Sequence, residues 1–222
     1  RVQGRSVRAH DMAGGTVWIL EDLTAAREAQ QQQDWAAIHD PLTQLCNREA
    51  FVQRMGVLLA ERSARARIPG IAAADAAEGE GDGVMLFLDL DYFTVVNDLA
   101  GHDAGDDVLR HVARLLESHV RQIGWAARLG GDEFAVVLPG CSLARGQALA
   151  EQLRAAVQAW EPSYQGRSFT LGASIGLVVL DASLQDVPSV LYAADMACYD
   201  AKRAGRNRVE TRHADQAAAS GR

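Results

Sequence analysis

The sequence predicts an α+β fold in which a mostly antiparallel sheet packs against helices. Residues 84–91, VMLFLDLD, form a continuous apolar run that ends in acids, the pattern of a central strand buried on both faces. Residues 128–139, RLGGDEFAVVLP, place Gly130 and Gly131 between two strand-like segments. Adjacent glycines favour a two-residue hairpin turn because both central positions need positive φ. Helical patterns alternate with these strands along the chain.

The composition describes a globular protein and restricts its partners. The 222 residues are 48% hydrophobic and 23% charged, which provides for one ordinary core. The net charge of −7 argues against broad nucleic-acid binding, so we expect no DNA partner. Cys46, Cys141 and Cys198 form no C-x-x-C pair, and we expect reduced thiols in a cytoplasmic setting.

The chain also predicts its relation to a longer protein. No apolar run reaches the roughly 18 residues of a membrane span, so membrane attachment would need parts beyond this chain. The first residue is Arg1 and not Met, and we therefore expect a piece of a larger, cytoplasmic or membrane-attached protein.

The first forty residues differ from those that follow. Residues 16–20, TVWIL, predict a short strand. Residues 21–40 contain helix formers with only a weak apolar stripe, which indicates a connecting helix. The expected division is a remnant of an upstream domain at 1–22, a linker helix at 23–39, a main domain at 40–212 and a disordered tail at 213–222.

The main domain shows a regular succession of elements. Asn47 is a suitable N-cap for a helix whose apolar residues recur at helical spacing. Residues 68–83 are rich in Ala, Gly and acids and predict a mobile loop, whereas residues 105–120 form the clearest amphipathic helix. The remaining expected elements are a helix at 142–159, a strand pair ending with residues 169–180, a helix at 187–203 and a last strand at 207–211.

Four acids follow the two predicted strands. Asp89 and Asp91 share one face of the first strand by its two-residue period, and Asp132 and Glu133 lie at the mouth of the hairpin. If the strands are neighbours, these carboxylates converge, and such oxygen ligands suit Mg²⁺ or Mn²⁺. The alternatives are that Asp89 and Asp91 only end a strand and cap the next helix, and that the hairpin tip is solvated and without function.

A cationic pair complements the acids. Lys202, the only lysine in the chain, and Arg206 are four residues apart at the end of the last helix. Metal-binding acids with such a pair would form a nucleoside triphosphate site, in which Asn97 and Asp106 could read a base edge. The alternative is that basic residues are favoured at a helix C-terminus by the macrodipole, with Gly205 ending the helix. The histidines, His111 and His119 among them, show no metal-ligand spacing.

Several ordered motifs resemble the GGDEF domain family, the diguanylate cyclases, over residues 40–212. The motifs are DPLTQLCNR at 40–48, FLDLDYFTVVND at 87–98, GHDAGDDVL at 101–109, RLGGDEF at 128–134, SIGL at 174–177 and YDAKRAGRNR at 199–208. The resemblance implies a fold like the nucleotide cyclase and polymerase palm, with a central five-stranded sheet wrapped by helices. Residues 14–29, GGTVWILEDLTAAREA, resemble the end of a PAS sensor domain running into its signalling helix.

The resemblance also implies an activity and a site. The family condenses two GTP into cyclic di-GMP and releases two pyrophosphates, with two Mg²⁺ or Mn²⁺ ions in each half-site. By motif, the metal ligands are Asp89, the Leu90 carbonyl and Asp132, and Glu133 either supports the metals or deprotonates the attacking 3′-hydroxyl. The implied substrate-binding set is Asn97 and Asp106 for guanine, Lys202 and Arg206 for the terminal phosphates, Gly130 and Gly131 at the turn, and Phe93.

Each domain of this type holds one GTP, so the resemblance implies a homodimer whose pairing is controlled by an upstream sensor domain through the linker helix. Two positions depart from the family pattern. Thr94 stands where the family has lysine, and the product-inhibition motif R-x-x-D reads RQIG, with Arg121 kept and Gly124 in place of the acid. The alternative function is a catalytically weak module that binds GTP or cyclic di-GMP and regulates a neighbouring phosphodiesterase domain.

Overall fold

The computed structural model describes residues 2–6, 16–20, 35–66, 82–181 and 183–212. The chain divides into two compact units, Arg1–Ala37 and Ile38–Arg222. In the first unit, β1 (Val2–Ser6) pairs antiparallel with β2 (Thr16–Leu20), so the strand predicted at 16–20 is present. The predicted linker helix before residue 35, most of the predicted loop at 68–83 and the predicted tail at 213–222 lie outside the described residues.

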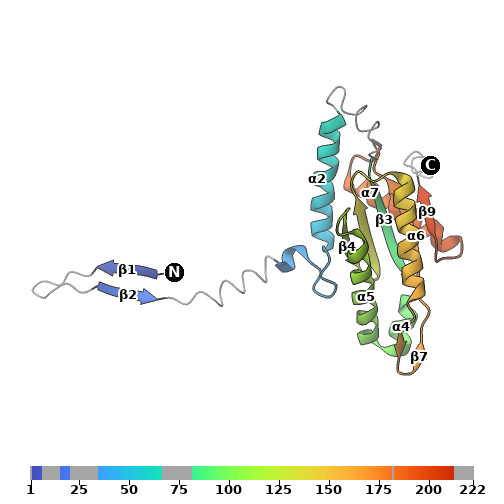
Figure 1. Ribbon diagram of the computed structural model, residues 1–222, viewed down its shortest axis with the longest axis horizontal. Coiled ribbons are helices and arrows are strands. Elements are labelled where there is room, and N and C mark those ends of the chain that lie inside the picture. The colour runs from blue at the N-terminus through green and yellow to red at the C-terminus, as the bar shows by residue number, and fades with distance from the viewer. Residues whose placement is uncertain (1, 7–15, 21–34, 67–81, 182, 213–222) are drawn as a thin grey trace, which may run out of the picture. The chain divides into compact units, whose positions relative to one another are not determined.

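The second unit is built on a five-stranded sheet in the order β4-β5-β3-β8-β9 (Figure 1). Its central strand, β3, pairs antiparallel with β5 and β8, and only the β8–β9 pairing is parallel. The predicted α+β fold with a mostly antiparallel five-stranded sheet is therefore confirmed. The strands are β3 (Val84–Asp91), β4 (Trp125–Gly130), β5 (Glu133–Leu138), β8 (Gly172–Val179) and β9 (Val209–Arg212).

Helices cover both faces of this sheet. On one face, even-numbered residues of β3 pack with α4 (Phe93–Ala100), α5 (His102–Val120) and α6 (Leu143–Ala159). On the other, Met85 and Phe87 pack with α2 (Arg48–Ala66) and α7 (Val187–Arg203). Since β3 is buried on both faces, polar groups at its end must find partners within the protein. Within the described segments, no helix has both the length and the hydrophobicity needed to cross a membrane.

Most predicted helices are confirmed with small shifts. The side chain of Asn47 accepts a hydrogen bond from the Ala50 N–H at 2.9 Å, as expected of the N-cap of α2. Helix α5 starts at His102, three residues before the predicted start at 105, and α4 was not predicted because its eight residues give little periodic signal. The predicted strand pair before residue 180 is a short hairpin of β6 (Ser163–Tyr164) and β7 (Arg167–Ser168), followed by β8 as a separate strand.

The predicted hairpin is present, but its turn is displaced by one residue. Gly130 is the last residue of β4 and lies opposite Glu133, so Gly131 and Asp132 form the turn. Gly130 still has φ 151° and Gly131 φ 51°, because the register shifts between Arg128 and Gly130. Gly130 therefore belongs to a β-bulge and Gly131 to the turn that follows it, and Asp132 lies at the tip of the hairpin.

Gly176 lets α7 approach the sheet closely. A Cβ atom added at Gly176 would lie 2.1 Å from the Ala194 carbonyl oxygen and 2.4 Å from the Cys198 nitrogen, both backbone atoms of α7. No side chain fits there without movement of the helix, which explains the glycine of the SIGL segment and brings α7 over the end of β3.

We predict that Gly176→Ala lowers the free energy of unfolding by about 1–3 kcal/mol, because α7 must move away from the sheet. Gly56→Ala is a matched control within α2, where the added methyl carbon meets nothing closer than a Val187 methyl at 3.9 Å. This control should stabilise the protein by up to about 1 kcal/mol. Denaturant unfolding of both variants tests the packing, and a Gly176→Ala protein as stable as the parent would contradict it.

Candidate active site

Carboxylates from two strands meet at the C-terminal end of β3. Asp89 lies opposite Glu133 in the antiparallel register, and Asp132 follows at the hairpin tip. The charge of Asp132 is close enough to Asp89 to raise its pKa. We call Asp89, Asp132 and Glu133 the acidic edge. The predicted convergence is therefore present for Asp89, Asp132 and Glu133, whereas the carboxylate of Asp91 is hydrogen-bonded to Ser174 and Asn207.

The only lysine reaches this edge from α7. Lys202 Nζ lies 2.6 Å from Asp89 Oδ2, and the Asp89 side chain is 14% exposed. Burial raises the pKa of Asp89, and the hydrogen bond and charge of Lys202 only partly offset this. Burial disfavours the charge on Lys202, but the contact with Asp89 outweighs it, so the pKa of Lys202 is raised as well. Lys202 thus contacts the acidic edge directly from the end of α7.

Glu133 lies in a strongly negative environment. Burial raises its pKa, and the charges of Asp89, Asp195 and Asp132 raise it further, whereas Arg48 opposes them. Arg48 begins α2 and donates to the Leu129 carbonyl at 3.5 Å. Neither Arg48 nor Asp195 was predicted as a site residue, since each comes from a helix far from the hairpin in sequence. A bound cation would relieve the repulsion at this edge.

The acidic edge offers few side-chain ligands of its own. Among the described residues, no three His, Cys, Asp or Glu side chains are grouped closely enough to hold a metal. Mg²⁺ in nucleotide sites takes one or two carboxylates and completes its shell with waters and phosphate oxygens. Asp89 and Asp132 supply two carboxylates at this edge, of which Asp89 is paired with Lys202.

The two predicted guanine ligands come from adjacent helices. A Cβ at Gly105 of α5 would lie 1.9 Å from Asn97 Oδ1, so the amide of Asn97 on α4 occupies the space that Gly105 leaves. Asp106 is the next residue along α5 and is 3.7 Å from Arg110. The same Cβ would lie 3.2 Å from the tip of Phe93, whose residue is 9% exposed. Phe93 therefore supports the pair from the core, and its ring does not face a substrate from solvent.

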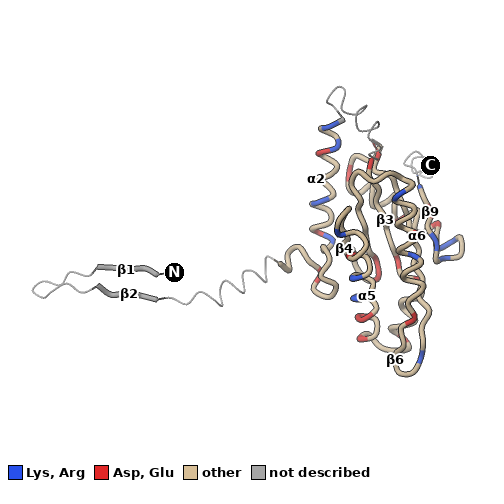
Figure 2. The backbone as a smooth tube through the Cα atoms, viewed as in Figure 1, with Lys and Arg blue, Asp and Glu red and all other residues tan. Residues whose placement is uncertain are grey.

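The remaining predicted substrate residues surround the same end of β3. Nothing lies within 4 Å of a Cβ built at Gly130 or Gly131, so the space outside the turn is open. Thr94 is exposed at the start of α4. The Arg206 guanidinium lies 5.5 Å from the ring centroid of Tyr92, the residue that follows β3. Figure 2 shows basic residues gathered on the segment between α7 and β9 that carries Arg206.

A second set of contacts ties the hairpin to the start of the main domain. Arg128 Nη1 donates to Asp40 Oδ1 at 3.1 Å, and its Nε and Nη2 donate to the Gly131 carbonyl at 3.0 and 2.8 Å. Asp40 Oδ1 also accepts from the Thr43 N–H at 2.8 Å and hydroxyl at 2.7 Å. Burial alone would raise the pKa of Asp40, but these hydrogen bonds and the Arg128 charge hold it below its usual value.

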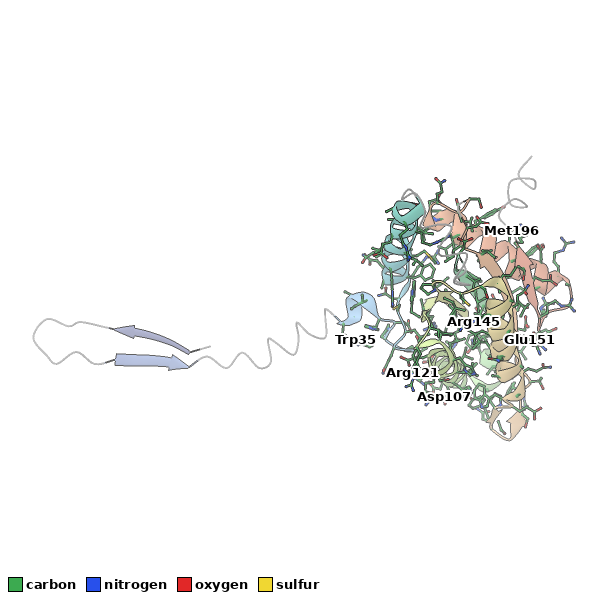
Figure 3. The ribbon with its side chains drawn as sticks, turned by 45° about the horizontal axis from the view of Figure 1, so that its top comes forward. Trp35, Asp107, Arg121, Arg145, Glu151 and Met196 are labelled. Atoms are coloured by element: carbon green, nitrogen blue, oxygen red, sulfur yellow. The ribbon has the colours of Figure 1, made fainter. Side chains whose placement is uncertain are left out.

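Arg121 lies beside a groove of about 720 Å³ whose lining includes Arg54, Arg145 and Trp125. Figure 3 labels Arg121, at the end of α5, and Arg145, on α6. A Cβ at Gly124 would lie 2.0 Å from the Val137 carbonyl oxygen of β5. The acid of the R-x-x-D motif is therefore not only absent but sterically excluded with this backbone.

No function is assigned to the thiols and histidines, although Cys198 lies close enough to the charges of Asp89 and Lys202 for them to affect its pKa. Cys46, Cys141 and Cys198 are free, and burial raises the pKa of Cys198 to about 12. His111 stacks on Trp160, with ring centroids 3.7 Å apart.

Fold and site together define an α+β domain with a carboxylate pair at the end of its central strand, faced by a lysine. A family model described as "Diguanylate cyclase, GGDEF domain" matches residues 37–208. The chain belongs to this family.

Similar proteins agree with that assignment. "Probable diguanylate cyclase DgcE" of Escherichia coli K12 is 36% identical over 205 residues, 92% of this chain and 17% of DgcE. "Diguanylate cyclase DgcP" of Pseudomonas aeruginosa is 37% identical over 190 residues, 86% of this chain and 26% of DgcP. The chain therefore spans a small part of these relatives. The coiled coil and GGDEF domain of DgcB from Caulobacter crescentus, solved in complex with c-di-GMP, has a TM-score of 0.72 at 29% identity and covers 86% of this chain and 94% of its own.

We predict that Asp40→Asn lowers the free energy of unfolding at pH 7 by about 1.5–3 kcal/mol, because Arg128 loses its charged partner. The folded-state pKa of Asp40 lies below the unfolded value of about 3.9. Its stabilisation is therefore present above that value and is lost as the pH falls through the folded pKa.

The stability gap between parent and Asp40→Asn should close in acid, as denaturant unfolding from pH 7 to pH 2.5 can measure. Asp82→Asn removes an exposed partner of Arg62, 3.0 Å away, and serves as the control. It should cost at most about 1 kcal/mol. If the difference in unfolding free energy between the parent and Asp40→Asn does not change with pH, the ionised Asp40 carboxylate is not the source of the stabilisation.

Proposed function

We propose that the main domain condenses two GTP into cyclic di-GMP and two pyrophosphates, as the output domain of a larger signalling protein. One observation carries this proposal: Asp89, Asp132 and Glu133 lie together at one edge of the sheet, and Lys202 Nζ is 2.6 Å from Asp89 Oδ2. Acids for a metal and a cation for phosphates are the two components that phosphoryl transfer needs. The family membership supplies the reaction.

In this proposal, separate groups of residues bind the guanine, the terminal phosphates and the metal ions. Asn97 and Asp106 hold guanine through hydrogen bonds to its edge, and Lys202 and Arg206 hold the terminal phosphates. Asp89, the Leu90 carbonyl and Asp132 would hold two Mg²⁺ or Mn²⁺ ions. When bound, such ions would make the attacking 3′-hydroxyl more nucleophilic and neutralise the charge of the leaving pyrophosphate.

Glu133 has the environment of a proton acceptor. Its raised pKa makes it a stronger base than an ordinary carboxylate, which suits removal of the 3′-hydroxyl proton by a Glu133 oxygen. The charge of Arg48 limits this rise in the pKa of Glu133.

Catalysis requires a homodimer in this proposal, because one domain presents one set of guanine and phosphate residues. Residues 1–22 would belong to an upstream PAS-like sensor and residues 23–39 to its linker helix, which would control how the two domains face each other. GTP is a cytoplasmic nucleotide, so we place the domain in the cytoplasm.

A regulatory module without turnover is the second candidate, and Thr94 favours it. An exposed threonine at this position of α4 supplies no charge for a phosphate, unlike the family's lysine. Such a module would bind GTP or cyclic di-GMP and control a phosphodiesterase domain elsewhere in the protein. Asp132, Glu133 and Lys202 are all present, which favours turnover.

We predict that the protein with GTP and Mg²⁺ forms cyclic di-GMP and pyrophosphate, and that Asp132→Ala lowers kcat by at least about 100-fold through loss of a metal ligand. The fold should survive, because residue 132 lies in an open turn. Asp107→Ala, which removes an exposed carboxylate 2.8 Å from Arg110, is the matched control. Chromatography of the products decides: a dimeric, GTP-binding parent that forms no product would identify the regulatory module.

We predict weak product inhibition at the Arg121 groove. Without an acid at 124, guanine N–H groups stay unpaired, which weakens cyclic di-GMP binding there by roughly five- to 150-fold. Arg121→Ala should therefore change the inhibition constant by less than about threefold. Because a side chain at 124 meets the Val137 carbonyl, Gly124→Asp would not restore the motif cleanly. Tight inhibition that disappears in Arg121→Ala would contradict the prediction.

A further inference from the structure

Asp91 is the one Asp, Glu, Lys or Arg residue among those described that is buried, with 3% of its surface exposed. It ends β3, two residues beyond Asp89 on the same face. Its Oδ1 accepts from the Ser174 hydroxyl at 2.7 Å, and its Oδ2 accepts from the Asn207 N–H at 2.8 Å. Both carboxylate oxygens are thus engaged by protein donors, and the proposed reaction gives Asp91 no role.

The Asn207 N–H belongs to a turn that needs support. Residues 204–208 join α7 to β9, and within them Arg206 has φ 64° and Asn207 φ 46°. Two consecutive left-handed residues with side chains are unfavourable and persist only where their surroundings hold them. Asn207 Oδ1 also accepts from Arg154 Nη1 of α6 at 3.0 Å. The turn is therefore fastened on one side to β3 and on the other to α6.

The fastened turn carries Arg206. Its guanidinium lies over the Tyr92 ring at 5.5 Å, and Tyr92 is the direct neighbour of Asp91 in the chain. Gly172 leaves the necessary room, since a Cβ there would lie 2.9 Å from Asp91 Oδ2 and 3.1 Å from Asn207 Cβ. The backbone N–H that Asp91 binds is one residue from Arg206, whose own N–H donates to the Ala201 carbonyl at 3.0 Å. The Asp91 carboxylate therefore helps to fix where this arginine lies.

We propose that Asp91 is a positioning residue, which through the Asn207 N–H holds Arg206 at the phosphate end of the site. The inference rests on the proposed function in one respect, the binding of the GTP terminal phosphates by Arg206. Asp91 is not itself a metal ligand in this proposal, because both of its oxygens are saturated by hydrogen bonds within the protein. Misplacing Arg206 weakens ground-state binding of GTP and so raises KM more than it lowers kcat.

The test compares two substitutions that differ in hydrogen bonding. Asn at 91 can accept from the Asn207 N–H and donate to Ser174 Oγ after the hydroxyl rotates, so Asp91→Asn keeps both contacts. Asp91→Ala loses both and should raise KM for GTP by about 10- to 100-fold, whereas Asp91→Asn should stay within about threefold of the parent. Ser174→Ala removes one contact and should give an intermediate KM. Thermal unfolding identifies any variant that fails to fold.

Coupling to Arg206 distinguishes positioning from a general loss of stability. If Asp91 acts through Arg206, the double variant Asp91→Ala, Arg206→Ala should have the KM of Arg206→Ala alone. Asp200→Ala is the matched control, because Asp200 fastens α7 to β9 through Arg212 at 3.0 Å without touching the turn. It should leave KM unchanged. Additive effects of Asp91→Ala and Arg206→Ala would overturn the proposal.

A readout without catalysis separates this inference from the proposed function. Amide hydrogen exchange at Asn207, measured without nucleotide, should be slow in the parent and in Asp91→Asn and fast in Asp91→Ala. Protection of Asn207 that survives in Asp91→Ala would overturn the proposal. So would a Mg²⁺ requirement that rises equally in Asp91→Asn and Asp91→Ala, which would identify a metal ligand. If the parent forms no cyclic di-GMP, the proposed function fails, while exchange at Asn207 and GTP-binding calorimetry still decide the role of Asp91.

Discussion

Two carboxylates at the end of a strand buried on both faces are the constraint on which this site depends. Asp91 is buried and the Asp89 side chain is only 14% exposed, so each carboxylate is stabilised by donors from the protein. Lys202 forms an ion pair with Asp89, and the Ser174 hydroxyl and the Asn207 N–H donate hydrogen bonds to Asp91. These donors come from α7, from β8 and from the turn after α7, and the position of all three follows from the need to satisfy the acids.

Close packing makes this arrangement possible. Gly176 brings the backbone of α7 against β8, and Gly105 leaves room for the Asn97 amide between α4 and α5. Gly172 does the same for Asp91 and Asn207. At Gly172 the missing side chain leaves room for the hydrogen bond between the Asn207 N–H and Asp91 Oδ2. Substitutions at these glycines would therefore disturb the site through packing, although none of them offers a chemical group.

The sequence predicted the sheet, its hairpin and the helices covering it, because long apolar runs and helical periodicity are local signals. It also placed Asp89, Asp132, Glu133 and Lys202 at one site, through adjacent strands and ordered motifs. The hairpin turn was misplaced by one residue, since a bulge at Gly130 leaves no trace in a two-glycine pattern. Arg48, Asp195 and Asn207 act through distant pairings that no local pattern contains.

Phe93 and Arg121 show that matching a family motif does not by itself fix the role of each residue in this chain. The ring of Phe93 lies in the core, so a motif position near a substrate need not expose its side chain. At Arg121, the arginine of the motif is present, but Gly124 packs against the β5 backbone where the acid would stand. Sterics of this kind depend on the neighbouring strand, and only the assembled sheet reveals them.

The most direct measurement is a crystal structure of the protein with Mn²⁺ and a non-hydrolysable GTP analogue, using the anomalous signal of the metal. We expect manganese between the Asp89 and Asp132 carboxylates, the guanine at Asn97 and Asp106, and the terminal phosphates at Lys202 and Arg206. Manganese bound elsewhere, or a nucleotide bound away from the acidic edge with Lys202 still paired to Asp89, would contradict the assignment of this edge as the catalytic site.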